Sequence, residues 1–148
     1  MKPRIFLAAV IAAIPQASPA QYTDPVAATY ACLAQPIENN DAFPTCLAPM
    51  ESAFTAAFDD IDHLQALVLQ SEPLTQQVVI AVSGNLSPVD NETRHNNLNT
   101  RGFAFQDSCI QYQNEQNISD NLIIWRCEAD INLFILHFHF DNYFDQWG

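Results

Sequence analysis

Residues 121–145, NLIIWRCEADINLFILHFHFDNYFD, carry the pattern that decides the predicted fold. Apolar residues first occupy every second position, and near Phe134 the apolar register moves to the opposite face. Alternation with a period of two is typical of a β-strand, and a change of face requires a bulge or a turn. The pattern therefore predicts two strands that are separated at ADIN, with the last strand at about residues 133–141.

The segments before this stretch supply the rest of the predicted sheet. GFAFQDSCIQYQ, residues 102–113, and the strand that begins at residue 121 flank NEQNISD, which is typical of a hairpin connection. In an antiparallel register, Cys109 would face Cys127 across this hairpin. QQVVIAVSG, residues 76–84, is short and rich in β-branched residues, and it predicts a further, central strand.

Residues 24–69 predict helices. Asp24 and Pro25 favour the start of a helix that is expected to end near Leu33. After Pro49, apolar residues recur every three or four positions, as on one face of a second helix. That face consists of Met50, Phe54, Phe58, Ile61, Leu64 and Val68. The expected fold is therefore α+β, with an N-terminal helical hairpin packed on an antiparallel β-sheet.

The N-terminal twenty residues predict a secretory signal. A basic start, an apolar run and a small-residue tail ending at Ala20 are the three parts of such a signal, and cleavage is expected after Ala20. Residues 21–148 would then be one small exported domain, periplasmic or secreted, without membrane insertion. Four cysteines in such a chain predict two disulfides, and spacing favours one of the three pairings. The predicted disulfides are Cys32–Cys46 and Cys109–Cys127.

Acidic residues dominate the chain after the predicted signal. Seventeen acidic residues stand there against three arginines, without any lysine, which makes a formal charge of −14. Such a surface repels nucleic acid and anionic lipid, and it attracts cations or a basic protein. The alternative is that the acidity only keeps the protein in solution in a salty habitat.

Residues 83–102, SGNLSPVDNETRHNNLNTRG, are almost wholly polar, and they predict a long loop. This loop would present Arg94, His95 and Arg101. Long loops on a rigid, disulfide-linked domain commonly carry binding residues. The leading hypothesis is therefore an exported, non-enzymatic binding or inhibitor protein that engages a basic protein partner, such as a cationic lysozyme or ribonuclease.

HFHFD, residues 137–141, indicates an alternative function. His137, His139 and Asp141 would share one face of the last strand, and imidazole and carboxylate groups are ligands of zinc and copper. The alternative hypothesis is a periplasmic zinc- or copper-binding protein, with His95 as a further ligand; otherwise no cofactor is expected. A solvated strand face that happens to carry two histidines is the simpler interpretation.

Signals for catalysis are weak. Glu128 and Asp130 lie on one face of a predicted strand, a pattern more typical of the wet side of a sheet than of acid–base chemistry. The sequence contains no glycine-rich phosphate loop and no serine in a nucleophile motif. We therefore predict no catalytic residue.

The C-terminal aromatic residues give a third hypothesis. Tyr143, Phe144 and Trp147 follow the predicted last strand closely. As an exposed tail they could dock this protein onto an envelope complex. Removal of residues 142–148 would then leave a folded monomer.

Overall fold

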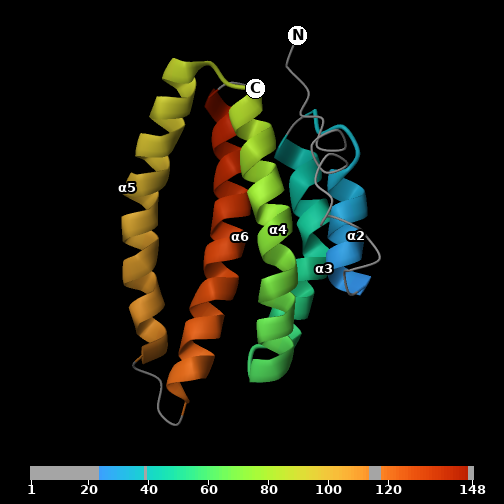
Figure 1. Ribbon diagram of the computed structural model, residues 1–148, viewed down its shortest axis with the longest axis vertical. Helices are drawn as coiled ribbons and strands as arrows, with labels where there is room; N and C mark the ends of the chain where they lie inside the picture. The colour runs from blue at the N-terminus through green and yellow to red at the C-terminus, as the bar shows by residue number, and fades with distance from the viewer. Residues whose placement is uncertain (1–23, 39, 114–117, 147–148) are drawn as a thin grey trace.

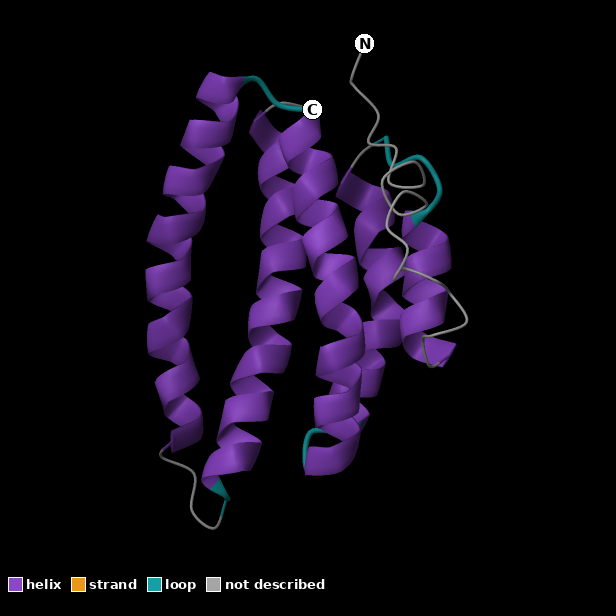
Figure 2. Ribbon diagram, viewed as in Figure 1, coloured by secondary structure: helices purple, strands orange, loops and turns teal. Residues whose placement is uncertain are grey.

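The protein is built from helices throughout its described part. The computed structural model describes residues 24–38, 40–113 and 118–146, and within them no strand is present (Figures 1 and 2). The elements in order are α2 (Asp24–Leu33), the short 3₁₀ helix η2 (Asn40–Ala42), α3 (Phe43–Ala56), α4 (Ile61–Gly84), α5 (Pro88–Gln113) and α6 (Asp120–Gln146). The α+β prediction is therefore wrong, because the predicted sheet is replaced by helices. The predicted signal, residues 1–20, lies outside the described residues.

An N-terminal helical hairpin is present, but α2 pairs with α3, whose bounds differ from those of the expected second helix, and residues 61–69 already belong to α4. The Cys32–Cys46 disulfide joins the two helices, with the Cα atoms 5.3 Å apart, so this predicted pairing is confirmed. The buried Thr29 hydroxyl also donates a hydrogen bond to the Cys46 carbonyl at 2.9 Å. The hairpin is thus held both covalently and by its packing.

The helix expected after Pro49 is in fact two helices. Pro49 lies inside α3, and a turn separates α3 from α4. The Asp60 side chain caps α4 by accepting a hydrogen bond from the backbone N–H of His63 at 3.2 Å. The predicted apolar face is still buried on both sides of the break, at Met50, Phe54, Leu64 and Val68.

The strand predicted at residues 76–84 is the C-terminal half of α4, so that prediction is wrong. Its buried residues have helical spacing: Leu74, Val78, Ala81 and Val82. A β-branched residue lowers helix propensity by less than about 1 kcal/mol. Burial of the whole apolar stripe of α4 outweighs that preference. The β-branched composition of residues 76–84 was therefore not enough to predict a strand.

Helix α5 occupies most of the predicted polar loop, and its last part replaces the strand predicted at 102–113. Ser87 caps the helix: its hydroxyl accepts from the Asp90 backbone N–H at 3.1 Å and donates to the Asp90 carboxylate at 2.8 Å. Pro88 holds the first helical position. These start signals are in the sequence, but a helix this polar lacks the apolar stripe by which helices are recognised.

Helix α6 replaces the strands predicted at 121–134 and 133–141, so these predictions are also wrong. It packs against α4 and also against α5. One side buries Ala129 and Leu136, whereas on another side the ring of Phe134 stacks on Phe105 of α5, with centroids 4.8 Å apart. Two apolar sides on one helix obscure the single helical stripe and imitate the alternation of a strand.

The second predicted disulfide joins α5 and α6. Cys109 and Cys127 have Cα atoms 5.8 Å apart, and the pairing is confirmed although it crosses two helices rather than two strands. Two disulfides are consistent with an extracellular or periplasmic protein. Across the described residues, no helix has both the length and the apolar character needed to cross a membrane.

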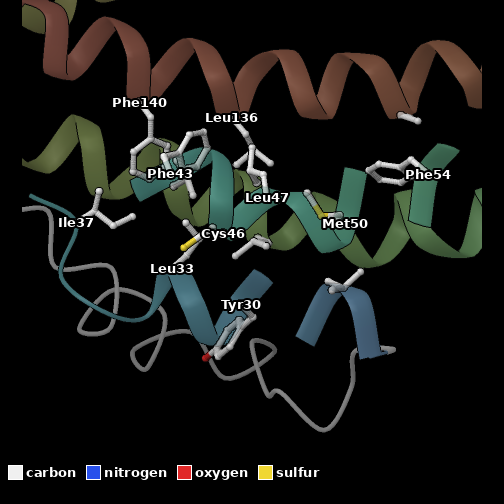
Figure 3. Close-up of a cluster of buried hydrophobic side chains, with 14 of the residues drawn as sticks. Tyr30, Leu33, Ile37, Phe43, Cys46, Leu47, Met50, Phe54, Leu136 and Phe140 are labelled. Atoms are coloured by element: carbon white, nitrogen blue, oxygen red, sulfur yellow. The ribbon is translucent and has the colours of Figure 1, made fainter. Parts of the chain in front are cut away.

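The core lies where α6 meets the N-terminal helices. Figure 3 shows Leu136 and Phe140 of α6 facing the side chains of α3, and the rings of Phe43 and Phe140 stack with centroids 3.8 Å apart. Figure 1 shows α4 and α5 on either side of α6. Helix α5 makes its main contacts with α6, so it is the least enclosed of the long helices.

Candidate functional site

A groove runs along the part of α6 that is exposed between α4 and α5. One hollow of about 430 Å³ lies between α4 and α6 and includes Val79 and Ile80. A second hollow of about 250 Å³ lies between α5 and α6 and includes Phe105. Ile131 and Ile135 line both hollows, so the two lie next to each other along α6, and together they are here named the α6 groove.

The α6 groove is acidic toward one end. Glu72 of α4 and Glu128 of α6 line it, and each precedes the apolar groove residues of its own helix. Helices α4 and α6 run in the same direction, so both carboxylates lie toward the same end of the groove (Figure 1). An apolar surface with acids at one end favours a ligand that is apolar along its length and cationic at one end.

A buried amide side chain also lines the α6 groove. Asn132 lines the groove with 6% of its surface exposed, and its Nδ2 has no hydrogen-bond partner among the described residues. A buried donor without a partner costs about 1–3 kcal/mol. A rotation of this amide toward the groove would offer the donor to an acceptor on a bound molecule.

Arg126 anchors α6 to the turn between α3 and α4. It is 5% exposed, and its Nε donates to the Phe58 carbonyl at 2.9 Å. Its guanidinium lies over the Phe58 ring, 4.5 Å from the centroid, and meets the exposed Asp59 carboxylate at 2.5 Å. Arg126 therefore has a structural role, because it links α6 to the turn that precedes α4.

The other two arginines attach α5 to α6. His139 donates from Nδ1 to the Ile135 carbonyl at 2.7 Å, which leaves Nε2 to accept from Arg94 Nη1 at 2.9 Å. Burial, opposed by the bond to Ile135 and assisted by the Arg94 charge, lowers the pKa of His139 from 6.5 to about 4. The Arg101 guanidinium lies 5.5 Å from the centre of the Phe138 ring. The Arg94–His139 hydrogen bond requires a neutral His139, because Nε2 can accept only when it carries no proton.

The residues of the predicted binding loop are therefore helical residues of α5. Arg94 and Arg101 contact α6, whereas His95 is exposed. The sequence predicted that these arginines contact a partner; in the structure both contact a second helix of the same chain.

The residues of the predicted metal site do not share one face. Successive residues of a helix are about 100° apart, so His137 and His139 point to nearly opposite sides of α6. His137 Nε2 lies 2.6 Å from Glu51 Oε1 of α3, and His139 is buried toward α5. Asp141 is one turn beyond His137. Nowhere in residues 24–38, 40–113 and 118–146 do three His, Cys, Asp or Glu side chains gather to hold a metal.

The proposed aromatic tail belongs to the core. Tyr143 is fully buried and Phe144 is 7% exposed, whereas Trp147 lies outside the described residues. Burial raises the pKa of Tyr143 above its usual value of 10.0. Two of the three residues are thus unavailable for docking.

The α6 groove itself was missed from the sequence. Val79 and Ile80 resembled the middle of a buried strand, and Ile131 and Ile135 resembled one face of another. The spacing of three and four residues that places Glu128, Ile131 and Ile135 on one helix face was the available signal. It was hidden by the second apolar side of α6.

No protein-family model, curated protein or solved structure matches this chain. No role can therefore be transferred to its residues from a relative. Its function has to be inferred from the α6 groove and from the charge of its surface.

Proposed function

We propose that this protein is an exported, non-enzymatic binding protein whose partner is a basic protein. The observation that carries the proposal is the different placement of its arginines and its acidic residues. Each arginine after the predicted signal contacts a residue within the fold, whereas none of the acidic side chains that the structure describes is buried. The acidic side chains of the described part therefore lie at the surface, and in a chain with a formal charge of −14 they attract a cationic partner over long range.

The state of His139 supports binding rather than catalysis. Its pKa is lowered strongly, which is common for catalytic bases. However, both of its ring nitrogens are engaged, one by the Ile135 carbonyl and one by Arg94. No nitrogen is left to exchange a proton with a substrate, so the lowered pKa reflects attachment of α5.

Calorimetry with a basic lysozyme and a basic ribonuclease tests the proposal, with an acidic protein of similar size as the control. We expect the basic proteins alone to bind, and their Kd to rise about tenfold or more between about 50 and 300 mM salt, because salt screens exposed charges. Binding that does not change with salt, or equal binding of the acidic control, would contradict the proposal.

A charge-depleted variant makes the test specific to this surface. Asp62→Asn, Glu92→Gln and Asp145→Asn together remove three exposed charges from α4, α5 and α6. We expect slower association with the basic probes and a weaker dependence on salt, with the helical circular dichroism unchanged. An unchanged association rate would show that the acidic surface does not guide binding.

A further inference from the structure

We propose that the α6 groove binds an amphipathic helix of the basic partner, with the cationic end of that helix beside Glu72 and Glu128. This inference rests on the proposed function and names the part of the partner that is recognised. It depends on the shape of the groove, on its uncovered apolar residues and on its charge.

The shape of the groove suits a helix. Glu128, Ile131 and Ile135 of the floor are three and four residues apart, and Gln76 and Ile80 of the α4 wall are four apart. Rows with these spacings are the ridges of a helix surface, between which the side chains of another helix fit. An added helix would pack on α4 and α6 as neighbouring helices of a bundle do.

Within the described part of the chain, no helix covers the groove. Helices α2 and α3 pack together and contact α4, and α5 contacts α6, as the arrangement in Figure 1 shows. Ile80 and Ile135 line the hollow between α4 and α6. Ile80 is 51% exposed, although the rest of α4 buries most of its large apolar residues. An occupant with an apolar face would remove this surface from water.

The charge of the groove selects among apolar occupants. None of the arginines in the described part neutralises Glu72 or Glu128, because those cations are engaged at other contacts. A second copy of this chain would bring a further charge of −14 to the interface, and an anionic amphiphile would meet the same carboxylates. A helix with lysine or arginine at one end complements both the acids and the apolar floor.

The probe is a synthetic helical peptide of leucine and lysine, about four turns long, with its lysines concentrated at one end. Its affinity for the full chain is measured by fluorescence anisotropy. The control peptide has the same composition in a scrambled order. We expect the scrambled peptide to bind about tenfold more weakly, because it keeps the composition but loses both the amphipathic face and the cationic end. Equal affinities would overturn the inference.

Two exposed apolar residues of α4 provide matched variants. Ile80 and Leu69 are 51% and 50% exposed, but only Ile80 lines the groove. We expect Ile80→Ser to weaken the peptide about five- to tenfold and Leu69→Ser to leave its affinity unchanged. Equal effects of the two variants would place the peptide elsewhere.

Two pairs of acids provide the matched charge variants. Glu72→Gln with Glu128→Gln removes the acids of the groove, and Glu92→Gln with Asp145→Asn removes two acids outside it. We expect a loss of affinity of about tenfold for the first pair and about twofold for the second, which retains the groove.

These outcomes separate the two proposals. If both acid-pair variants lose the same peptide affinity and Ile80→Ser loses none, the peptide does not bind in the groove. The proposal that overall charge attracts a basic partner would then remain. Failure of both the peptide and the basic proteins to bind would overturn both. Sedimentation tests the remaining occupant, since a wild-type dimer that dissociates in Ile80→Ser would assign the groove to a second copy.

Discussion

Helix α6 is held by different physical means on its two sides. Toward α3 and α4 it buries Leu136 and Phe140 completely, in a core that also encloses Phe43. Toward α5 the main attachments are the Arg94–His139 hydrogen bond, a cation–π contact, one aromatic pair and a disulfide. The first side depends on removing apolar surface from water, and the second on a few specific links.

This difference explains why the sequence did not reveal α5 as a helix. The apolar interface leaves a stripe of three- and four-residue spacing, as in Met50, Phe54, Leu64 and Val68. Hydrogen bonds, a cation–π contact and a disulfide involve only a few residues, so they leave no apolar stripe in the sequence. The polar α5 was therefore predicted as a loop. A large energetic difference between the two sides should follow.

Phe140→Ala has the largest expected effect. The ring is fully buried and stacked on Phe43, so its removal should lower the free energy of unfolding by about 3–5 kcal/mol. Phe105→Ala removes the matching ring of the α5 side, which is only partly buried against Phe134, and should cost less than about half as much. Urea unfolding of the oxidised protein measures both. Similar losses of unfolding free energy in the two variants would contradict the energetic difference between the two sides of α6.

Removal of a disulfide should affect the two sides differently. Cys109→Ala with Cys127→Ala and Cys32→Ala with Cys46→Ala open links of 18 and 14 residues, so each should cost about 3 kcal/mol by chain entropy. Hydrogen exchange should accelerate selectively in α5 only after loss of the first pair, because α5 has few other attachments. Equal protection of α5 in both variants would show that its noncovalent contacts suffice.

Acidification should weaken the α5 side. The folded protein lowers the pKa of His139 to about 4, whereas the unfolded chain has the ordinary 6.5, so below pH 6.5 the unfolded state binds the proton first. Stability is therefore independent of this group above pH 6.5 and falls between 6.5 and about 4. Urea unfolding should show a loss of about 2 kcal/mol between about pH 7.5 and pH 5.

His139→Gln is the control for this pH dependence. The variant has no imidazole at position 139, so the loss assigned to His139 should disappear. An unchanged pH dependence in the variant would show that another group is responsible.

Gly102→Ala has the smallest expected effect, and its sign is opposite. Gly102 lies inside α5, and an added Cβ would meet no atom within 4 Å, so the substitution should raise stability by about 0.5–1 kcal/mol through helix propensity. Gly84→Ala, at the last residue of α4, should gain less. A loss of stability in Gly102→Ala would mean that α5 is not helical at this position in solution.

Two arginines could be singled out from the sequence, but the residues that they contact could not. Arg94 and Arg101 were recognised as unusual cations in an acidic chain, but their partners lie 45 and 37 positions away, at His139 and Phe138. Long-range pairs of this kind have no local signature. The α6 groove was unpredictable for the same reason, since its walls come from three helices.

The sequence by itself determined the helix at residues 24–33, the Cys32–Cys46 pairing and the strongly acidic charge, because these depend on local spacing and on composition. The Cys109–Cys127 pairing is also correct, although it was predicted from a strand register that the structure replaces with two helices. Only the tertiary structure decided that residues 76–84, 88–113 and 120–146 are helical and that a groove opens along α6. Helix α6 is apolar on two sides because it has two neighbours, and α5 is stable as a polar helix because α6 provides its partners. Both are properties of packing between distant segments, and these override local preference.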